Sequence, residues 1–238
     1  MDTDMELTQP GDLPAQDGDG TAQTGSDALQ PEASQPIDDA PKGPQWQERD
    51  AWTALDDLDA SPTLVPASEW PAGAEGLGRP GLFALWVDET GAAELARGLE
   101  LPLEAGRIYV GQAGATKWPS GRANTDTLGE RIARTHLTGK VRSSTVRLSL
   151  AAILFAQLEL VVQASALLQA SAEQALSDWM SAHLSVAVHP HDDRDTLAGL
   201  EQAVAQRLDP PLNIEEHLPL TPERERVVAL RRRISREG

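Results

Sequence analysis

The sequence predicts a mixed α/β domain that follows an N-terminal tail. Three short runs, at 81–87, 107–110 and 184–188, have the apolar or alternating pattern of β-strands. Between and after these runs, apolar residues recur three or four positions apart, as in helices that pack on a core. The first 62 residues carry neither pattern, so we expect one domain preceded by a tail.

The tail, residues 1–62, is acidic and poor in large apolar residues. Such a segment buries too little surface to offset the entropy of ordering, and we expect it to be disordered. Residues 1–79 hold 17 acidic and 3 basic residues, whereas residues 80–238 hold 20 and 17. One cluster in the tail could bind a protein partner or mimic DNA, or, as we favour, pack loosely on the domain: Trp46, Trp52, Leu55 and Leu58 among Glu48, Asp50, Asp56, Asp57 and Asp59.

A Pro/Gly-rich linker, residues 63–78, leads into the domain. The run 81–87 is apolar on both faces, which indicates a covered strand. After a turn at 88–91 we expect a short helix at 92–99, and the chain then returns to a second strand that begins at Arg107 and breaks at Gly111.

The remaining elements are mainly helical. Thr127 and Glu130 form a capping-box pattern, which predicts a helix over 127–137. Further helices are expected at 145–157, at 171–183 and from Asp195 or Thr196 to Leu208, where prolines stop the pattern. The last stretch, 217–238, predicts a basic helix over 221–236.

Several protein classes are excluded by composition. Without cysteine the chain can form neither disulfides nor zinc–thiolate sites, and we expect a cytoplasmic protein. The first residues lack the basic and apolar regions of a signal peptide. The longest apolar tract, 148–170, contains Gln157, Glu159, Gln163 and Gln169, so we expect no membrane association.

One segment of the domain is basic although the chain is acidic. Residues 107–147 hold 8 basic and 2 acidic side chains, enough to contact a phosphate backbone. The alternative is a solvated surface balanced by its neighbours. The candidate nucleic-acid-binding residues are Lys117, Arg134, Lys140, Arg142 and Arg147.

Tyr109, the only tyrosine, ends a predicted strand and faces a predicted helix that carries Arg131 and His136. A phenol, a guanidinium group and an imidazole can together form a phosphate-cleaving site. By contrast, His189 and His191 are separated by a proline and lack a convergent cluster, so we interpret them as part of a polar loop and not as metal ligands.

The order of these residues resembles the GIY-YIG nuclease family, in its restriction-endonuclease-like branch. Gly81-Leu82-Phe83 resembles the first half-motif and Tyr109-Val110-Gly111 the second. Arg131, His136, Glu201 and Asn213 follow in the order of the family's remaining motif residues. The resemblance covers residues 79–216.

The resemblance implies a small α/β fold with a three-stranded, mainly antiparallel sheet flanked by helices, and a helical insertion at 138–183 that offers a surface for a homodimer. It implies hydrolysis of DNA phosphodiester bonds with Mg²⁺ or Mn²⁺. Tyr109 would activate or position the attacking water, or act as general base, and Arg131 would hold the phosphate. Glu201 would be the metal ligand, His136 would assist proton transfer or bind phosphate, and Asn213 would bind near the phosphate or brace the site.

Two residues depart from the family pattern. Phe83 stands where the first half-motif usually has tyrosine, and Gln112 stands where some members have lysine. The loss of a hydroxyl at Phe83 leaves an alternative open: a non-catalytic module that keeps the fold and binds nucleic acid or protein. The DNA target stays open, and RNA is an alternative substrate.

Overall fold

A computed structural model describes residues 45–117, 120–163, 167–215 and 217–237. The helices are α1 (Glu48–Leu55), α2 (Glu89–Leu99), α3 (Leu128–Glu130), α4 (Thr145–Ile153), α5 (Ala170–His183), α6 (Leu197–Leu208) and α7 (Pro222–Glu237). Two π-helical segments are η1 (Asp56–Ala60) and η3 (Arg131–Leu137), and two 3₁₀ turns are η2 (Ala67–Glu69) and η4 (Val141–Ser143). The strands are β1 (Val65–Pro66), β2 (Gly81–Val87), β3 (Gly106–Ala113), β4 (Val162–Gln163), β5 (Leu167–Leu168) and β6 (Leu184–Pro190).

The main sheet is antiparallel throughout, with the strand order β1-β6-β2-β3. The α/β fold class predicted from the sequence is therefore confirmed, but the sheet has four strands and not three. The added strand is β1, a two-residue edge strand whose Val65 pairs with Val186 of β6. A run this short has no periodic pattern, which is why the linker 63–78 gives no strand signal.

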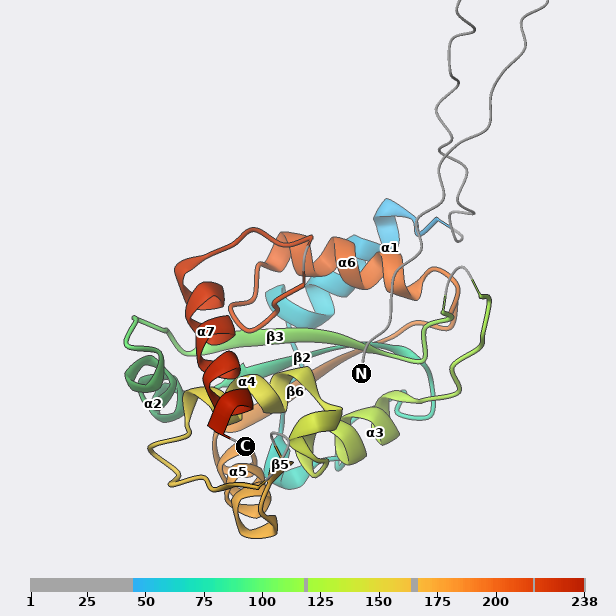
Figure 1. The fold of residues 1–238 in the computed structure, drawn as a ribbon. Helices are drawn as coiled ribbons and strands as arrows, with labels where there is room; N and C mark the ends of the chain where they lie inside the picture. The colour runs from blue at the N-terminus through green and yellow to red at the C-terminus, as the bar shows by residue number, and fades with distance from the viewer. Residues whose placement is uncertain (1–44, 118–119, 164–166, 216, 238) are drawn as a thin grey trace, which may run out of the picture. The chain divides into compact units, whose positions relative to one another are not determined.

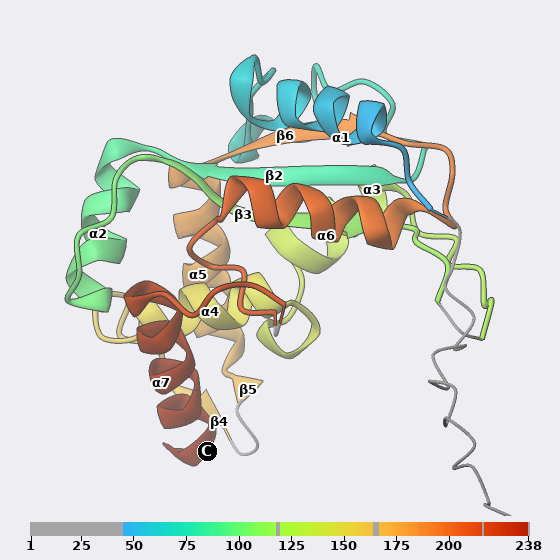
Figure 2. The same ribbon diagram turned by 90° about the horizontal axis from the view of Figure 1, so that it is seen from above.

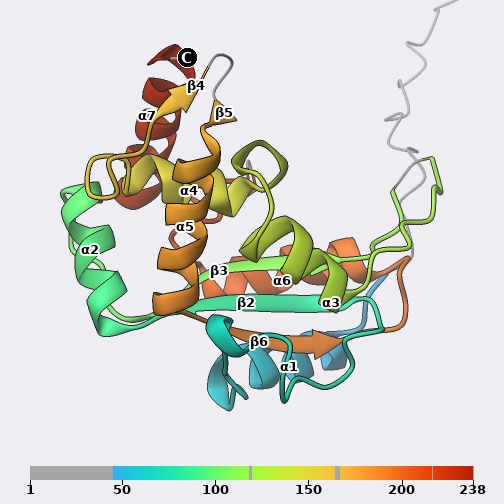
Figure 3. The same ribbon diagram turned by 90° about the horizontal axis from the view of Figure 1, so that it is seen from below.

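Helices cover both faces of this sheet (Figure 1). On one face α1 and α6 pack against Leu82, Ala84, Val110 and Ala187, with α6 lying along β3 (Figure 2). On the other face α3, α4 and α5 enclose the larger core, and α7 packs on α4 (Figure 3). This double cover is the physical reason for the continuous apolar run of β2.

Most predicted elements are confirmed within a few residues. The helix expected at 145–157 ends at Ile153, and the insertion 138–183 also contains the small β4–β5 pair. Among the described residues, no helix is long and apolar enough to cross a membrane.

The expectation of disorder over residues 1–62 is wrong for residues 48–60. Ala51, Ala54 and Leu58 are fully buried against α6 and the sheet. An ion pair between Asp59 and Arg107 of β3 also holds the segment on the domain. These contacts come from distant parts of the chain, so composition alone does not show them. Residues 1–44 of the predicted tail lie outside the described residues.

The two tail tryptophans differ in burial. Trp46 packs partly buried beside α6, whereas Trp52 is 62% exposed. The guanidinium group of Arg207 lies 5.5 Å from the Trp46 ring centroid and 5.9 Å from that of Trp52. The favoured alternative, in which the tryptophans pack on the domain, is therefore confirmed for Trp46. Trp52 is mostly exposed and lies near the guanidinium group of Arg207.

Candidate active site

Tyr109 lies in the middle of β3, opposite Leu85 of β2. Its ring is buried beside Phe83 at a centroid distance of 6.1 Å and beside His136 at 6.3 Å. Its hydroxyl oxygen lies 3.3 Å from the hydroxyl oxygen of Thr145, the first residue of α4. Because Thr145 is exposed, this pair places the phenol at the boundary between the core and solvent.

The glycine of the second half-motif makes room for these rings. A β-carbon at Gly111 would lie 2.7 Å from the tip of Phe83 and 2.9 Å from Tyr109. Similarly, a β-carbon at Gly81 would lie 2.3 Å from the carbonyl oxygen of His189 on β6. Both motif glycines are thus required by close approach and not by backbone angle.

Two carboxylates, those of Glu201 and Glu215, lie close enough to Tyr109 to raise its pKa. Glu201 projects from α6, which covers the other face of the sheet, and Glu215 follows the turn after α6. Burial, with a further contribution from Glu215, raises the pKa of Glu201 to about 8, and Arg131 opposes this shift. Two carboxyl groups in a site with little solvent would stabilise a bound cation.

The pKa of the Tyr109 phenol depends on the same charged groups. Burial raises the pKa of Tyr109 above its ordinary range, and the charges of Glu201 and Glu215 raise it further. The Thr145 hydrogen bond and the charge of Arg131 act in the opposite direction. Tyr109, Arg131 and Glu201, which are far apart in sequence, are therefore within electrostatic reach of one another.

Arg131 is the first residue of η3, and its side chain is 37% exposed. A guanidinium nitrogen lies 3.5 Å from a carboxylate oxygen of Asp126, a distance typical of a loose surface ion pair. The group is therefore accessible to a phosphate while it faces the carboxylates of the site.

Asn213 braces the edge of β3. Its side chain accepts a hydrogen bond from the backbone nitrogen of Val110 and donates one to the backbone oxygen, both at 2.8 Å. It also donates to Glu215 at 3.3 Å. Because β3 is an edge strand, these bonds satisfy backbone groups next to Tyr109, and Asn213 supports the site without being exposed to a substrate.

His136 has a different environment from the one we expected. It is 3% exposed, its ring centroid lies 5.0 Å from that of Phe83, and its Nδ1 atom lies 2.9 Å from the Ser144 hydroxyl oxygen. Burial, together with Arg131 and Arg147, lowers its pKa to about 3. A neutral, enclosed imidazole does not contact a phosphate, so the expectation of direct phosphate binding is wrong.

Among the candidate nucleic-acid-binding residues, Arg147 is also a correction. Its side chain is fully buried and pairs with Glu173 at 3.0 Å. It also donates to the backbone oxygens of His136 and Leu137. A polar side chain in the first turn of a helix gave no sign of this burial. The other four are exposed: Lys117, Arg134, Lys140 and Arg142.

Gln112 has a local role in the structure. Its side-chain oxygen accepts a hydrogen bond from the backbone nitrogen of Ala115 at 3.1 Å, which holds the turn that leaves β3. Three residues beside the site are not among the site residues that the sequence predicts: Ser144, Thr145 and Glu215. Glu215 follows Asn213 by two positions and could have been found from that spacing, whereas Thr145 has no signal in the sequence.

The residues present fit a divalent cation. Across the described part of the chain, no group of three or more His, Cys, Asp or Glu side chains is placed to hold a metal. However, the Oε2 atom of Glu215 is buried without a hydrogen-bond partner, and burial disfavours the charge of Glu201. A hard cation that keeps most of its water suits one or two carboxylates of this kind.

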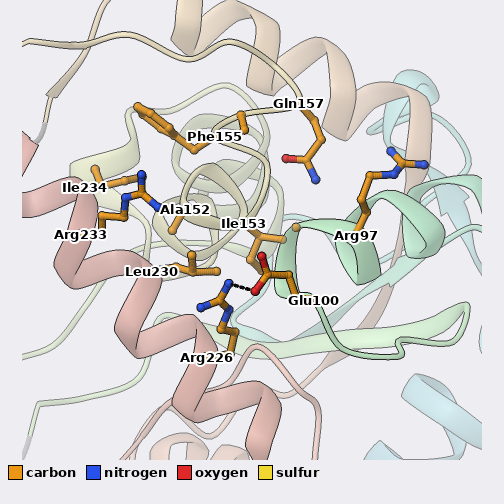
Figure 4. Close-up of a pocket in the computed structure, with 12 residues that line it drawn as sticks. Arg97, Glu100, Ala152, Ile153, Phe155, Gln157, Arg226, Leu230, Arg233 and Ile234 are labelled. Carbon is orange, nitrogen blue, oxygen red and sulfur yellow. Dashed lines mark hydrogen bonds and ion pairs between the residues drawn. The ribbon is translucent and has the colours of Figure 1, made fainter.

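A pocket of about 380 Å³ lies elsewhere, between α2, α4 and α7 (Figure 4). It has an apolar floor that includes Ile153 and Ile234, and arginines at its edge. None of the candidate catalytic residues lines it. The candidate site at β3 is therefore separate from this pocket.

Comparison with known proteins agrees with this arrangement. The family model described as the GIY-YIG catalytic domain matches residues 100–233, more than half of the 238-residue chain. The match includes Tyr109, Arg131, Glu201 and most of α7, and it begins after β2, which carries Gly81 and Phe83. Comparison with curated proteins and with solved structures gave no match. The chain belongs to the GIY-YIG catalytic domain family, whose members are nucleases.

Proposed function

We propose that this protein is a metal-dependent endonuclease that hydrolyses phosphodiester bonds of DNA. The observation that carries the proposal is the convergence of Tyr109, Arg131 and Glu201 at one edge of β3, from three separate elements. A phenol can position the attacking water, a guanidinium group can bind the phosphate, and a carboxylate can bind the metal ion.

In this proposal Tyr109 positions the attacking water. With its pKa raised, the phenol stays protonated at neutral pH and acts through hydrogen bonds, with Thr145 fixing its orientation. The water oxygen forms a bond to phosphorus as the water loses a proton to solvent, and the bond between phosphorus and the leaving deoxyribose oxygen breaks as that oxygen takes a proton from solvent. Arg131 holds the non-bridging oxygens and offsets the charge that develops there.

Glu201, with Glu215 beside it, would hold Mg²⁺ or Mn²⁺. When bound, such an ion supplies Lewis-acid stabilisation of the phosphate and lowers the pKa of water. The carboxyl proton that burial retains on Glu201 has to leave before the cation binds, so binding of the ion and release of a proton are coupled.

The four exposed basic residues, Lys117, Arg134, Lys140 and Arg142, would contact the phosphate backbone of the DNA. The acidic partner segment, the homodimer surface and the cytoplasmic location remain predictions from the sequence.

The test is cleavage of supercoiled plasmid and of a duplex pool with a randomised centre, with Mg²⁺ or Mn²⁺. The randomised pool detects a sequence-specific enzyme that the plasmid lacks a site for, and matched RNA and branched-DNA substrates define the nucleic acid. Glu201→Gln should abolish cleavage and retain the fold by circular dichroism. Glu104→Gln, the same change at an exposed position, is the control and should cleave normally.

A second function is favoured by one observation, Phe83. It is fully buried and carries no hydroxyl at the position where the first half-motif usually has one. A nucleic-acid-binding module without catalysis would bind DNA through Arg131 and the exposed basic residues and would be indifferent to Glu201→Gln. Binding without cleavage of any substrate would therefore select this alternative.

A further inference from the structure

We infer that the pocket between α2, α4 and α7 binds a small amphiphilic anion, a molecule with one anionic head and an apolar body (Figure 4). The pocket has a volume of about 380 Å³, within the range of sites that enclose small ligands. None of the candidate catalytic residues lines it, so binding there is separate from the proposed cleavage of DNA.

The floor of the pocket is apolar. Three of its residues are almost fully buried: Ala152, Ile153 and Ile234, at 3%, 2% and 3% exposure. Phe155 and Leu230 are partly buried and extend this apolar surface. Removing such a surface from water is favourable only when the ligand is itself apolar there. The floor therefore suits a hydrocarbon chain or an aromatic ring.

The contact between α2 and the end of α4 fixes one wall of the pocket. A β-carbon at Gly98 would lie 2.8 Å from the Cγ2 atom of Ile153 and 2.9 Å from the Nε2 atom of Gln157, so only glycine permits this close approach. The same Nε2 atom donates to the backbone oxygen of Glu94 at 3.2 Å. The wall is therefore formed by contacts of the chain itself, before any ligand binds.

The rim of the pocket is cationic. It is lined by Arg97 of α2 and by Arg226 and Arg233 of α7, and Glu100 is the one carboxylate among the described residues that line it. Glu100 is paired with Arg226. This local excess of positive charge stands out in a chain whose net charge is −17. A carboxylate, sulfonate or phosphate group would meet complementary charge here, whereas a cation would be repelled.

Arg226 is held in a position to receive such an anion. Its Nε atom donates to the backbone oxygen of Leu99 at 3.0 Å, and its Nη2 atom donates to Glu100. These contacts leave the N–H groups of its Nη1 atom for a ligand. Because the guanidinium group is already fixed, little side-chain entropy is lost when it binds an anion. Arg97, on a different helix, supplies a second guanidinium group (Figure 4).

The class of ligand is tested on the full chain with two anionic probes, anilinonaphthalene sulfonate and octanoate. Fluorescence of the first probe should show saturable binding, and octanoate should compete with it. Octanol has the same apolar body without the charge, and acetate has the head without the body, so each should compete at least about tenfold more weakly. Equal competition by octanol, or no saturable binding of either probe measured by fluorescence and calorimetry, would overturn the inference.

The place of binding is tested by filling the pocket. Ala156 is exposed and lines the pocket, so Ala156→Trp should abolish probe binding and leave urea unfolding unchanged. Ala229→Trp makes the same change at an exposed position of α7 that does not line the pocket, and should bind as the parent does. Parental affinity in Ala156→Trp would show that the probes bind elsewhere.

The anion contact is tested at Arg97, because Arg226→Gln would also remove the contacts with Leu99 and Glu100. Arg97→Gln should weaken both probes about tenfold, as expected for the loss of one hydrogen bond to a charged group, and Arg97→Lys should retain most of the affinity. Arg232→Gln removes the same charge from an exposed residue outside the pocket and is the control. If Arg97→Gln and Arg232→Gln bind the probes equally well, the cationic rim does not hold the anionic head and the inference fails.

Discussion

The hydroxyl oxygens of Tyr109 and Thr145 lie 3.3 Å apart, although 36 residues separate them in the chain. Thr145 begins α4 directly after its cap, Ser144, whose hydroxyl lies 2.9 Å from Nδ1 of His136. One helix start therefore supports two rings of the site, in a chain where Phe83 supplies no hydroxyl of its own.

Removal of the Thr145 hydroxyl should impair Tyr109 without unfolding the domain. Thr145→Val keeps the shape of the side chain but removes a hydrogen bond that lowers the pKa of Tyr109, so that pKa should rise further. We expect kcat for DNA cleavage to fall about tenfold, the cost of one neutral hydrogen bond of about 1.4 kcal/mol. Thr145→Ser, which retains the hydroxyl, should keep the parental rate. Equal rates for the valine and serine variants would contradict the role of this bond.

The raised pKa of Glu201 should make metal-free stability fall as pH rises. Its pKa in the folded protein, about 8, lies above the ordinary value of 4.5, so between these values the folded state binds more protons than the unfolded state. The free energy of unfolding should therefore decrease with pH in this window, by up to about 1.4 kcal/mol per unit. Urea unfolding at several pH values measures this slope.

Glu201→Gln should remove that slope, and Mg²⁺ added at pH 8 should stabilise the parent and not the variant. Equal slopes in parent and variant, with Glu104→Gln as the exposed control, would show that the Glu201 carboxyl is solvated and not held at the site.

The buried imidazole of His136 should act in the opposite direction. Its folded pKa of about 3 lies below the ordinary 6.5, so the unfolded state binds the extra proton between these values. Stability should fall as pH decreases from 6.5 toward 3, again by up to about 1.4 kcal/mol per unit. His136→Gln should flatten this acid limb, and the exposed His217→Gln should not. If His136→Gln keeps the same loss of stability between pH 6.5 and 3, that loss comes from other titratable groups.

A methyl group at Gly111 should disturb the two rings that it faces. Gly111→Ala places a β-carbon 2.7 Å from Phe83 and 2.9 Å from Tyr109, and forced repacking of this kind costs roughly 1–3 kcal/mol. Gly78→Ala is the matched control, because nothing lies within 4 Å of its added carbon. Urea unfolding and plasmid cleavage should both report the difference. Gly111→Ala combined with Phe83→Leu should recover part of the stability, and its failure to do so would exclude the ring clash as the cause.

The sequence by itself determined the local elements of this protein. Periodicity located β2, α6 and α7 within a few residues, because each has an apolar pattern that matches one type of secondary structure. The order of Tyr109, Arg131, Glu201 and Asn213 indicated the family before any geometry was known, since the motif depends on residue type and order.

Tertiary structure alone decided what each polar side chain can reach. Arg147 and Arg142 lie five positions apart in the same basic segment, but Arg147 is fully buried against Glu173 and Arg142 is exposed. On α7, Arg231 is partly buried whereas the adjacent Arg232 is exposed. In the acidic segment 48–60, α6 and the sheet bury Ala51, Ala54 and Leu58. Burial and pairing depend on contacts between residues far apart in the chain, and these contacts leave no periodic trace in the sequence around each residue.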